Sequence, residues 1–265
     1  MDERLTNDAH QKPSKTAPPS IREHPVPLGT RRNTASMSRG RVRTHTPNSR
    51  TRSSAHLSEA QIIGAVEAAA HARVIGKPLN RFITIHLEKG ELPGRAQDSI
   101  AAFLKPAAAW LRQRGVALTR IWWLEHATGT GVHAHMFLHV PPELSEAFGH
   151  QARNRWLRAA GLVPHQGVIR TERIGPRGFD ISNAPQKQHQ SYANQLTGVV
   201  RYMGKTINPD AISGLHRHLP KRERPTLAAA FGIKPEYSHP IYGRRISVSE
   251  NIGPAARKRY QSVRR

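Results

Sequence analysis

The sequence has no cysteine, few aromatic residues and no long apolar run. Without cysteine the chain cannot form disulfides, iron–sulfur clusters, thiolate zinc sites or a cysteine nucleophile. Aromatic residues make up 6% of the 265 residues, which argues against an extended surface for stacking nucleobases. No stretch approaches the roughly 20 apolar residues of a membrane span, and the N-terminus lacks the apolar core of a signal peptide. We therefore expect a cytoplasmic protein that has no membrane partner.

Acidic residues are also scarce relative to basic ones. The chain has 41 Lys and Arg against 18 Asp and Glu, a formal net charge of +23. An excess of this size indicates a polyanionic partner, for which nucleic acid is the default. Residues 1–56 contribute 11 basic and 4 acidic residues, which leaves 30 basic and 14 acidic residues, or +16, for residues 57–265. The rest of the chain is thus basic in its own right.

Composition divides the chain into three parts. Residues 1–56 are rich in Pro, Ser, Thr and Arg and hold almost no branched apolar residues, so we expect a disordered basic arm. Residues 57–209 carry the periodic apolar patterns of a folded domain. Residues 210–265 are basic and rich in proline, and we treat them as a C-terminal extension whose role the sequence does not assign.

Periodicity within the folded part predicts an α+β domain. Apolar spacing and stop signals predict helices over about 58–75, 98–114, 143–160 and 188–206. Alternation predicts strands over 81–87, 120–126, 132–140 and 168–174. The second and third strands are joined by a short turn-rich segment and form a β-hairpin. This order of elements favours an antiparallel sheet with helices packed on it.

The hairpin carries a candidate metal site. His133 and His135 alternate along a strand and therefore share one face of it. A hairpin symmetric about Gly129 pairs Glu125 with His133, so a carboxylate and two imidazoles converge, as ligands of a divalent cation must. A slip of one residue would put His126 in place of Glu125. Partly exposed sheet histidines with no ligand role are the alternative.

A second candidate feature lies on the helix expected over 188–206. Tyr202 and Lys205 are three residues apart and share a helix face, so a phenol and an ammonium group can reach the same target. A core tyrosine beside a lysine that lies along the surface is the alternative. Tyr192, ten residues earlier, lies on a different face. Residues 198–206 look like a phosphate-binding loop, but five residues separate the glycines where that motif has four, so we expect no ATPase.

Together these features resemble the HUH endonucleases. In that family a strand with two alternating histidines is followed by a helix with Tyr-x-x-Lys, and histidines that precede the tyrosine are typical of rolling-circle replication initiators. The resemblance implies that His133 and His135 bind the metal, with Glu125 as third ligand. It likewise implies that Tyr202 is the catalytic nucleophile and Lys205 its catalytic helper.

The resemblance covers about residues 80–208 and implies an HUH/RRM-like fold. It implies an enzyme that uses Mg²⁺ or Mn²⁺ to nick single-stranded DNA at an origin hairpin of a plasmid or phage and to rejoin it through a 5′-phosphotyrosine. Host replication helicase and polymerase would then be further partners. A mobilisation relaxase or single-tyrosine transposase would share this chemistry, and a non-catalytic nucleic-acid-binding α+β module is the alternative outside it.

Overall fold

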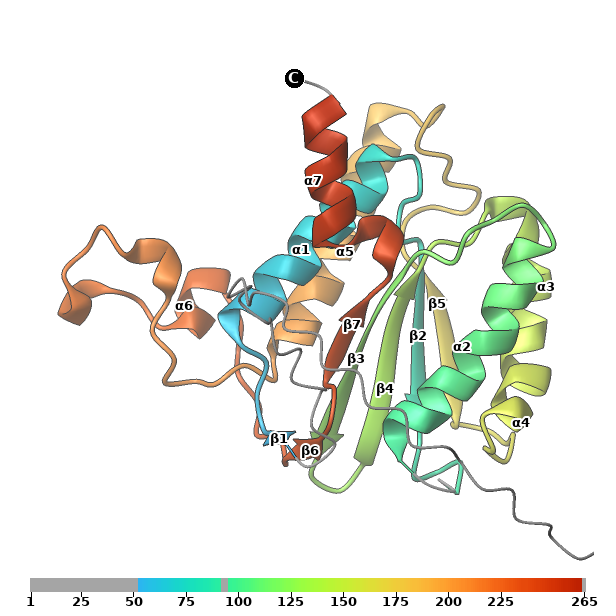
Figure 1. Ribbon diagram of the computed structural model, residues 1–265, viewed down its shortest axis with the longest axis horizontal. Coiled ribbons are helices and arrows are strands. Elements are labelled where there is room, and N and C mark those ends of the chain that lie inside the picture. The colour runs from blue at the N-terminus through green and yellow to red at the C-terminus, as the bar shows by residue number, and fades with distance from the viewer. Residues whose placement is uncertain (1–51, 92–94, 264–265) are drawn as a thin grey trace, which may run out of the picture. The chain divides into compact units, whose positions relative to one another are not determined.

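A five-stranded antiparallel sheet forms the centre of the protein. The computed structural model describes residues 52–91 and 95–263. The strand order is β5-β2-β4-β3-β7, and every neighbouring pair is antiparallel (Figure 1). The strands are β2 (Arg81–His86), β3 (Arg120–Ala127), β4 (Gly131–Leu138), β5 (Ile169–Arg173) and β7 (Ile246–Val248). The expected α+β class with an antiparallel sheet is confirmed.

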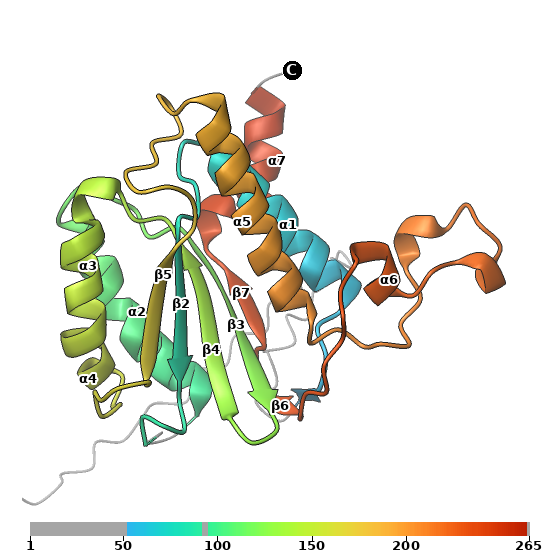
Figure 2. The same ribbon diagram turned by 180° about the vertical axis from the view of Figure 1, so that it is seen from behind.

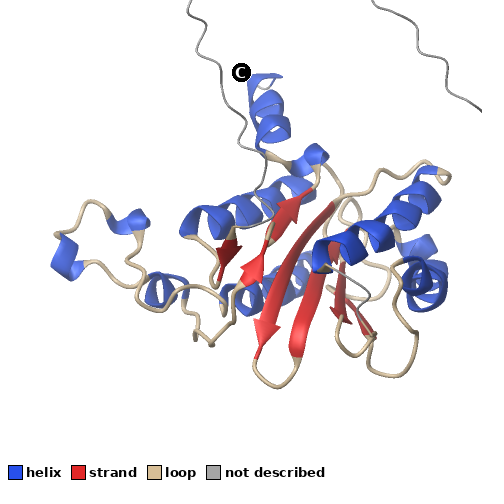
Figure 3. Ribbon diagram, turned by 60° about the horizontal axis from the view of Figure 1, so that its bottom comes forward, coloured by secondary structure: helices blue, strands red, loops and turns tan. Residues whose placement is uncertain are grey.

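Helices cover both faces of this sheet. Figures 1 and 2 show α2 on one face and α5 on the other, and Figure 3 shows the strands between the helices. The first helix begins with a capping box, since the side chains of Ser58 and Gln61 each accept a hydrogen bond from the backbone amide of the other residue. The helices are α1 (Glu59–Val74), α2 (Ala96–Arg112), α3 (Ser145–Gln151), α4 (Leu157–Ala159), α5 (Gln186–Gly204), α6 (Leu227–Phe231) and α7 (Pro254–Val263).

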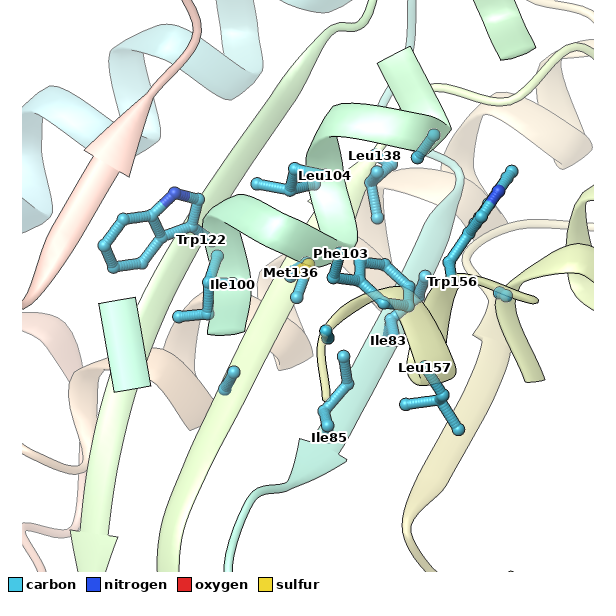
Figure 4. Packing of buried hydrophobic residues seen from close by; sticks show 14 of the residues in the cluster. Ile83, Ile85, Ile100, Phe103, Leu104, Trp122, Met136, Leu138, Trp156 and Leu157 are labelled. Atoms are coloured by element: carbon cyan, nitrogen blue, oxygen red, sulfur yellow. The ribbon is translucent and has the colours of Figure 1, made fainter. Parts of the chain in front are cut away.

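The alternation of the strands produces two separate apolar cores. On one face, strand residues such as Ile83 and Met136 pack under α2 and α4 (Figure 4). On the other face, Trp123 and Phe137 pack with residues of α1 and α5. Because side chains alternate along β4, His133 and His135 share the second face with Phe137. The sheet therefore directs its histidines toward α5.

The helix expected over 143–160 is interrupted. A 3₁₀ turn (Pro142–Leu144) precedes α3, and a π-helical stretch (Ala152–Trp156) separates α3 from α4. A π turn holds more residues than an α turn and so rotates the side chains that follow it. Here Trp156 lies edge-on to the rings of Phe103 and Phe148, in the first core. Packing of this tryptophan accounts for a helix that is not uniform.

The boundaries expected for the folded part are too narrow at both ends. Residues 1–51 of the expected basic arm lie outside the described residues, but its last part is ordered, because β1 (Ser53–Ser54) pairs with β6 (Ile241–Tyr242). The C-terminal segment is not a separate extension, since β7 adds an edge strand to the sheet by pairing with β3. Strands of two or three residues are too short to show alternation, so the sequence pattern does not reveal them.

Among the helices of the described segments, none combines the length and the apolar character that a membrane crossing requires.

Candidate functional site

The register of the β3–β4 hairpin is the one expected from its symmetry. Glu125 pairs with His133, and Trp123 pairs with His135. His126 pairs with Val132 instead, and its ring lies 4.8 Å from that of His239, measured between centroids. The slipped register is thus wrong, and Glu125 is the residue that shares a face with the two histidines.

Glu125 is buried between a strand and a helix. Its residue surface is 2% exposed. Its Oε2 lies 3.1 Å from Nε2 of His135, and its Oε1 lies 2.9 Å from Nζ of Lys205, which follows directly after α5. Each carboxylate oxygen therefore has its own partner, one on β4 and one at the end of the helix that carries Tyr202.

These partners keep the carboxylate charged. Burial on its own would raise the pKa of Glu125, but the hydrogen bonds from His135 and Lys205 outweigh burial and lower this pKa to about 2. Burial on its own would lower the pKa of Lys205, but its interactions with Glu125, and to a smaller extent with Tyr202, outweigh burial and raise this pKa above its ordinary value. At neutral pH the site thus holds a carboxylate and an ammonium ion in direct contact.

Tyr202 lies above the same group of residues and is open to solvent. Its ring is edge-on to that of His135, with 5.2 Å between centroids, and edge-on to that of Phe82 at 6.2 Å. Nζ of Lys205 lies 4.1 Å from the centre of the phenol ring. The residue is 41% exposed. The structure thus brings together Tyr202, Lys205, Glu125 and His135, although they come from three separate segments.

The other expected histidine has a neighbour that sequence reasoning missed. His133 on β4 pairs with His86 on the neighbouring strand β2, and their ring centroids lie 4.3 Å apart. The alternation of β2 could have placed His86 on this face, but only once β2 was known to lie beside β4. His135 in turn has its Nδ1 3.0 Å from the hydroxyl of Thr84, also on β2.

The histidines of this cluster stay neutral near pH 7. Burial, with repulsion from His86 and His135, lowers the pKa of His133 to about 4. Burial also lowers the pKa of His135 despite the opposing effect of Glu125, and it lowers the pKa of His86. Neutral imidazole is the form that can bind a metal ion.

The donor set fits a divalent cation, although its side chains are not arranged around one. In the part of the chain that the structure describes, no three His, Cys, Asp or Glu side chains form a ligand set as they stand. The Glu125 carboxylate is instead hydrogen-bonded to His135 and paired with Lys205. However, Nε2 of His133 is buried and has no hydrogen-bond partner among the described residues, which is costly for a polar atom. Two neutral imidazoles and a charged carboxylate are ligands that such a cation accepts.

A C-terminal segment, residues 236–239, borders the site. The Glu236 amide donates to the Lys205 carbonyl oxygen at 2.7 Å, and the Glu236 carboxylate lies 3.2 Å from Nζ of Lys205. At the other end, the His239 amide donates to the His126 carbonyl oxygen at 2.9 Å. Between them Tyr237 is 70% exposed. This segment joins the end of α5 to the end of β3, and the sequence pattern had not indicated it.

Tyr192 has a different environment from Tyr202. It is buried in the second core, where its hydroxyl donates to the Leu79 carbonyl oxygen at 3.4 Å, and burial raises its pKa. It lies outside the cluster around Glu125, in agreement with the expected difference in helix face.

The fold and this site define an α+β protein whose antiparallel sheet holds a buried carboxylate, imidazole and ammonium group beneath an exposed phenol. In comparisons with known proteins, no family model, no curated protein and no solved structure matched the chain.

Proposed function

We propose that this protein is an HUH-type endonuclease that nicks and rejoins single-stranded DNA through Tyr202, with an HUH/RRM-like fold. The observation that carries the proposal is the position of Tyr202, whose ring contacts His135 while Lys205 of the same segment contacts Glu125. A nucleophile must lie beside the groups that activate its target, and this arrangement supports that role. A tyrosine on the far side of the sheet would have argued against it.

The reaction needs only the exchange of one phosphoester for another. The Tyr202 oxygen attacks a backbone phosphorus, the new O–P bond replaces the bond to the 3′ oxygen, and the phenol proton balances the charge on the departing 3′ oxygen. The products are a 5′-phosphotyrosine and a free 3′ hydroxyl, and the reverse step rejoins the strand. Because the two esters are similar in energy, rejoining requires no ATP. A phenol is mostly protonated at neutral pH, so the Lys205 ammonium would stabilise the phenolate that attacks.

Glu125, His133 and His135 would hold the divalent cation, for which Mg²⁺ or Mn²⁺ is our proposal. A bound cation would draw electron density from a phosphate oxygen and so make the phosphorus easier to attack. The unpartnered Nε2 of His133 supports a ligand there. The Glu125 carboxylate would have to exchange one of its present hydrogen bonds for this ion.

The charge of residues 57–265 and an exposed tyrosine next to the site support nucleic acid as substrate. Residues 57–265 carry a net charge of +16, which favours a polyanion and predicts strong dependence of binding on salt. Tyr237 is exposed and lies one residue from a contact of Lys205, where it could stack on an unpaired base. For a rolling-circle initiator the substrate would be an origin hairpin, and host helicase and polymerase in the cytoplasm would continue replication.

A covalent adduct tests the proposal directly. The protein is incubated with Mn²⁺ and a labelled pool of single-stranded oligonucleotides of randomised sequence, and then run on a denaturing gel. We expect a slower band from the wild type and none from Tyr202→Phe. Tyr242→Phe, at another exposed tyrosine outside the cluster, is the matched control and should keep the band. An adduct that persists in Tyr202→Phe would contradict the proposal. Binding of the oligonucleotides without any adduct would favour a non-catalytic module.

A further inference from the structure

Arg81, the first residue of β2, is a buried cation away from the cluster around Glu125. Alternation places its side chain with those of Ile83 and Ile85, which belong to the first core, on the face opposite to the histidines. The residue is only 7% exposed. Burying a guanidinium group is costly unless other groups compensate its charge, so the partners of Arg81 decide what this position does.

The described residues compensate this charge only in part. The Arg81 guanidinium donates a hydrogen bond to the Ser145 hydroxyl, but its buried Nε has no hydrogen-bond partner in the described part of the chain. Within residues 52–91 and 95–263, none of the ion pairs includes Arg81. A neutral hydroxyl does not neutralise a guanidinium, so the described residues leave the charge of Arg81 without a counter-ion.

Other arginines surround Arg81 instead of carboxylates. Arg173 is its direct partner across the β2–β5 ladder, and like charges at such positions destabilise a sheet. Arg177, in the loop after β5, lines the same cavity as these two arginines. Burial together with the charges of Arg173 and Arg153 lowers the pKa of Arg81 to about 10. Several cations therefore face one space, an arrangement that an anion would stabilise.

The cavity is large enough for such an anion. Its volume is about 210 Å³, whereas one water molecule needs only about 10–15 Å³ of space. Two carboxylates, those of Glu143 and Glu146, also line it, but both residues are exposed and neither forms an ion pair within the described segments. They lower the positive potential at the cavity without neutralising Arg81.

We propose that this cavity binds a phosphate group of a nucleic acid strand. Guanidinium groups bind phosphate oxygens through paired hydrogen bonds, and Arg81 lines the cavity with no carboxylate partner among the described residues. Alternation along β2 puts Arg81 on the opposite face of the sheet from Phe82, whose ring contacts Tyr202. The sheet thus lies between the bound phosphate and Tyr202, so this phosphate positions the strand without reacting. The inference rests on the proposed function only in taking nucleic acid as the source of the phosphate.

Inorganic phosphate is the first probe, titrated into the full chain and measured by calorimetry. Arg173→Ala and Arg177→Ala replace exposed residues, so their folding is less at risk than that of Arg81→Ala, and circular dichroism checks it. We expect each to weaken phosphate binding about tenfold, the loss of a charge-assisted hydrogen bond. Arg158→Ala, at an exposed arginine that does not line the cavity, should bind like the wild type. Unchanged binding in both cavity variants would overturn the proposal.

An unstructured oligonucleotide without terminal phosphates is the second probe, measured by fluorescence anisotropy over a range of salt concentrations. We expect the cavity variants to bind it more weakly, with the slope of log affinity against log salt reduced by about 0.7, the value for one phosphate contact of a single strand. Glu146→Gln should strengthen binding, because it removes a negative charge from the cavity. Weaker binding of inorganic phosphate with unchanged binding of the oligonucleotide would overturn nucleic acid as the source.

These measurements do not depend on nicking. All of them are repeated in the Tyr202→Phe background, where we expect the same loss on removal of Arg173 or Arg177. If Tyr202 proves not to form an adduct while both arginines still contribute to binding, the proposed reaction fails and the phosphate site stands. If Tyr202 forms the adduct while neither arginine contributes to binding, the phosphate site is rejected and the proposed reaction stands.

Discussion

The carboxylate of Glu125 on β3 and the ammonium group of Lys205 after α5 lie 2.9 Å apart, with side chains 3% and 14% exposed. This buried ion pair connects the hairpin that carries His133 and His135 to the segment that carries Tyr202. Because Tyr202 is only three residues from Lys205, the pair also fixes the phenol beside the histidines. Its contribution is therefore positional as well as electrostatic.

Removal of the lysine should destabilise the protein. We expect Lys205→Met to lower the free energy of unfolding by about 3–5 kcal/mol, because it leaves the buried charge of Glu125 without its cationic partner. Lys187→Met, at an exposed lysine of the same helix, is the matched control and should stay within about 0.5 kcal/mol of wild type. Urea unfolding measures both. In Lys205→Met/Glu125→Gln the loss should be smaller than the sum of the two single losses, and simple additivity would show that the pair is not coupled.

Divalent cations should stabilise the folded protein if the proposed ligands bind them. At Mn²⁺ concentrations about 100-fold above the dissociation constant, stabilisation of about 2.7 kcal/mol is expected, seen as a higher Tm. His133→Gln should lose this shift because it removes the ring nitrogen that has no partner. His218→Gln, outside the cluster, should keep it. Equal shifts in wild type and His133→Gln would contradict the assignment of His133 as a ligand.

The hairpin site could be predicted because its geometry is local. Only three residues lie between the paired segments, so symmetry about Gly129 determined which residue faces His133, and the register agrees. Only an α-helical spacing was needed to place Tyr202 and Lys205 on one face. Neither pattern alone indicates that the hairpin and the helix with Tyr202 lie side by side. That expectation came from the resemblance to the HUH endonucleases.

The rest of the site depends on contacts between distant segments. His86 joins His133 only because β2 pairs with β4, 47 residues apart along the chain at this point. The two backbone hydrogen bonds that hold residues 236–239 against Lys205 and His126 can be made by any residue type, so composition held no signal for them. Strand β7 has only three residues, too few to show alternation, so the sequence did not reveal it. Because β7 was missed, the C-terminal boundary of the folded part was set too early.

Acid should destabilise the metal-free protein well before it protonates Glu125. The pKa of His133 is about 4 in the folded chain, against about 6.5 in an unfolded one. Below pH 6.5 the unfolded chain therefore binds a proton that the folded chain does not, and stability falls as pH falls until both forms are protonated below about pH 4.

The difference between the folded and unfolded pKa values of His133 corresponds to a loss of about 3 kcal/mol in the free energy of unfolding over this pH range. Urea unfolding between pH 7 and pH 4, with a chelator present, should show a flatter pH dependence for His133→Gln than for the wild type. Parallel curves for the two proteins would mean that His133 is not held neutral by its surroundings.

Tyr237 should contribute to binding of a single strand next to the site. It is 70% exposed, and its ring is perpendicular to that of His239, with 4.9 Å between centroids, so most of the residue is open to solvent, where a base could stack. Base stacking on one aromatic side chain contributes about 1–3 kcal/mol, so Tyr237→Ala should weaken binding of an oligonucleotide about tenfold at fixed salt. Tyr237→Phe keeps the ring and should bind like the wild type. Tyr242→Ala, which removes another exposed ring, is the matched control. If Tyr237→Ala and Tyr242→Ala weakened binding equally, the effect would come from general surface changes and not from a base stacked beside Lys205.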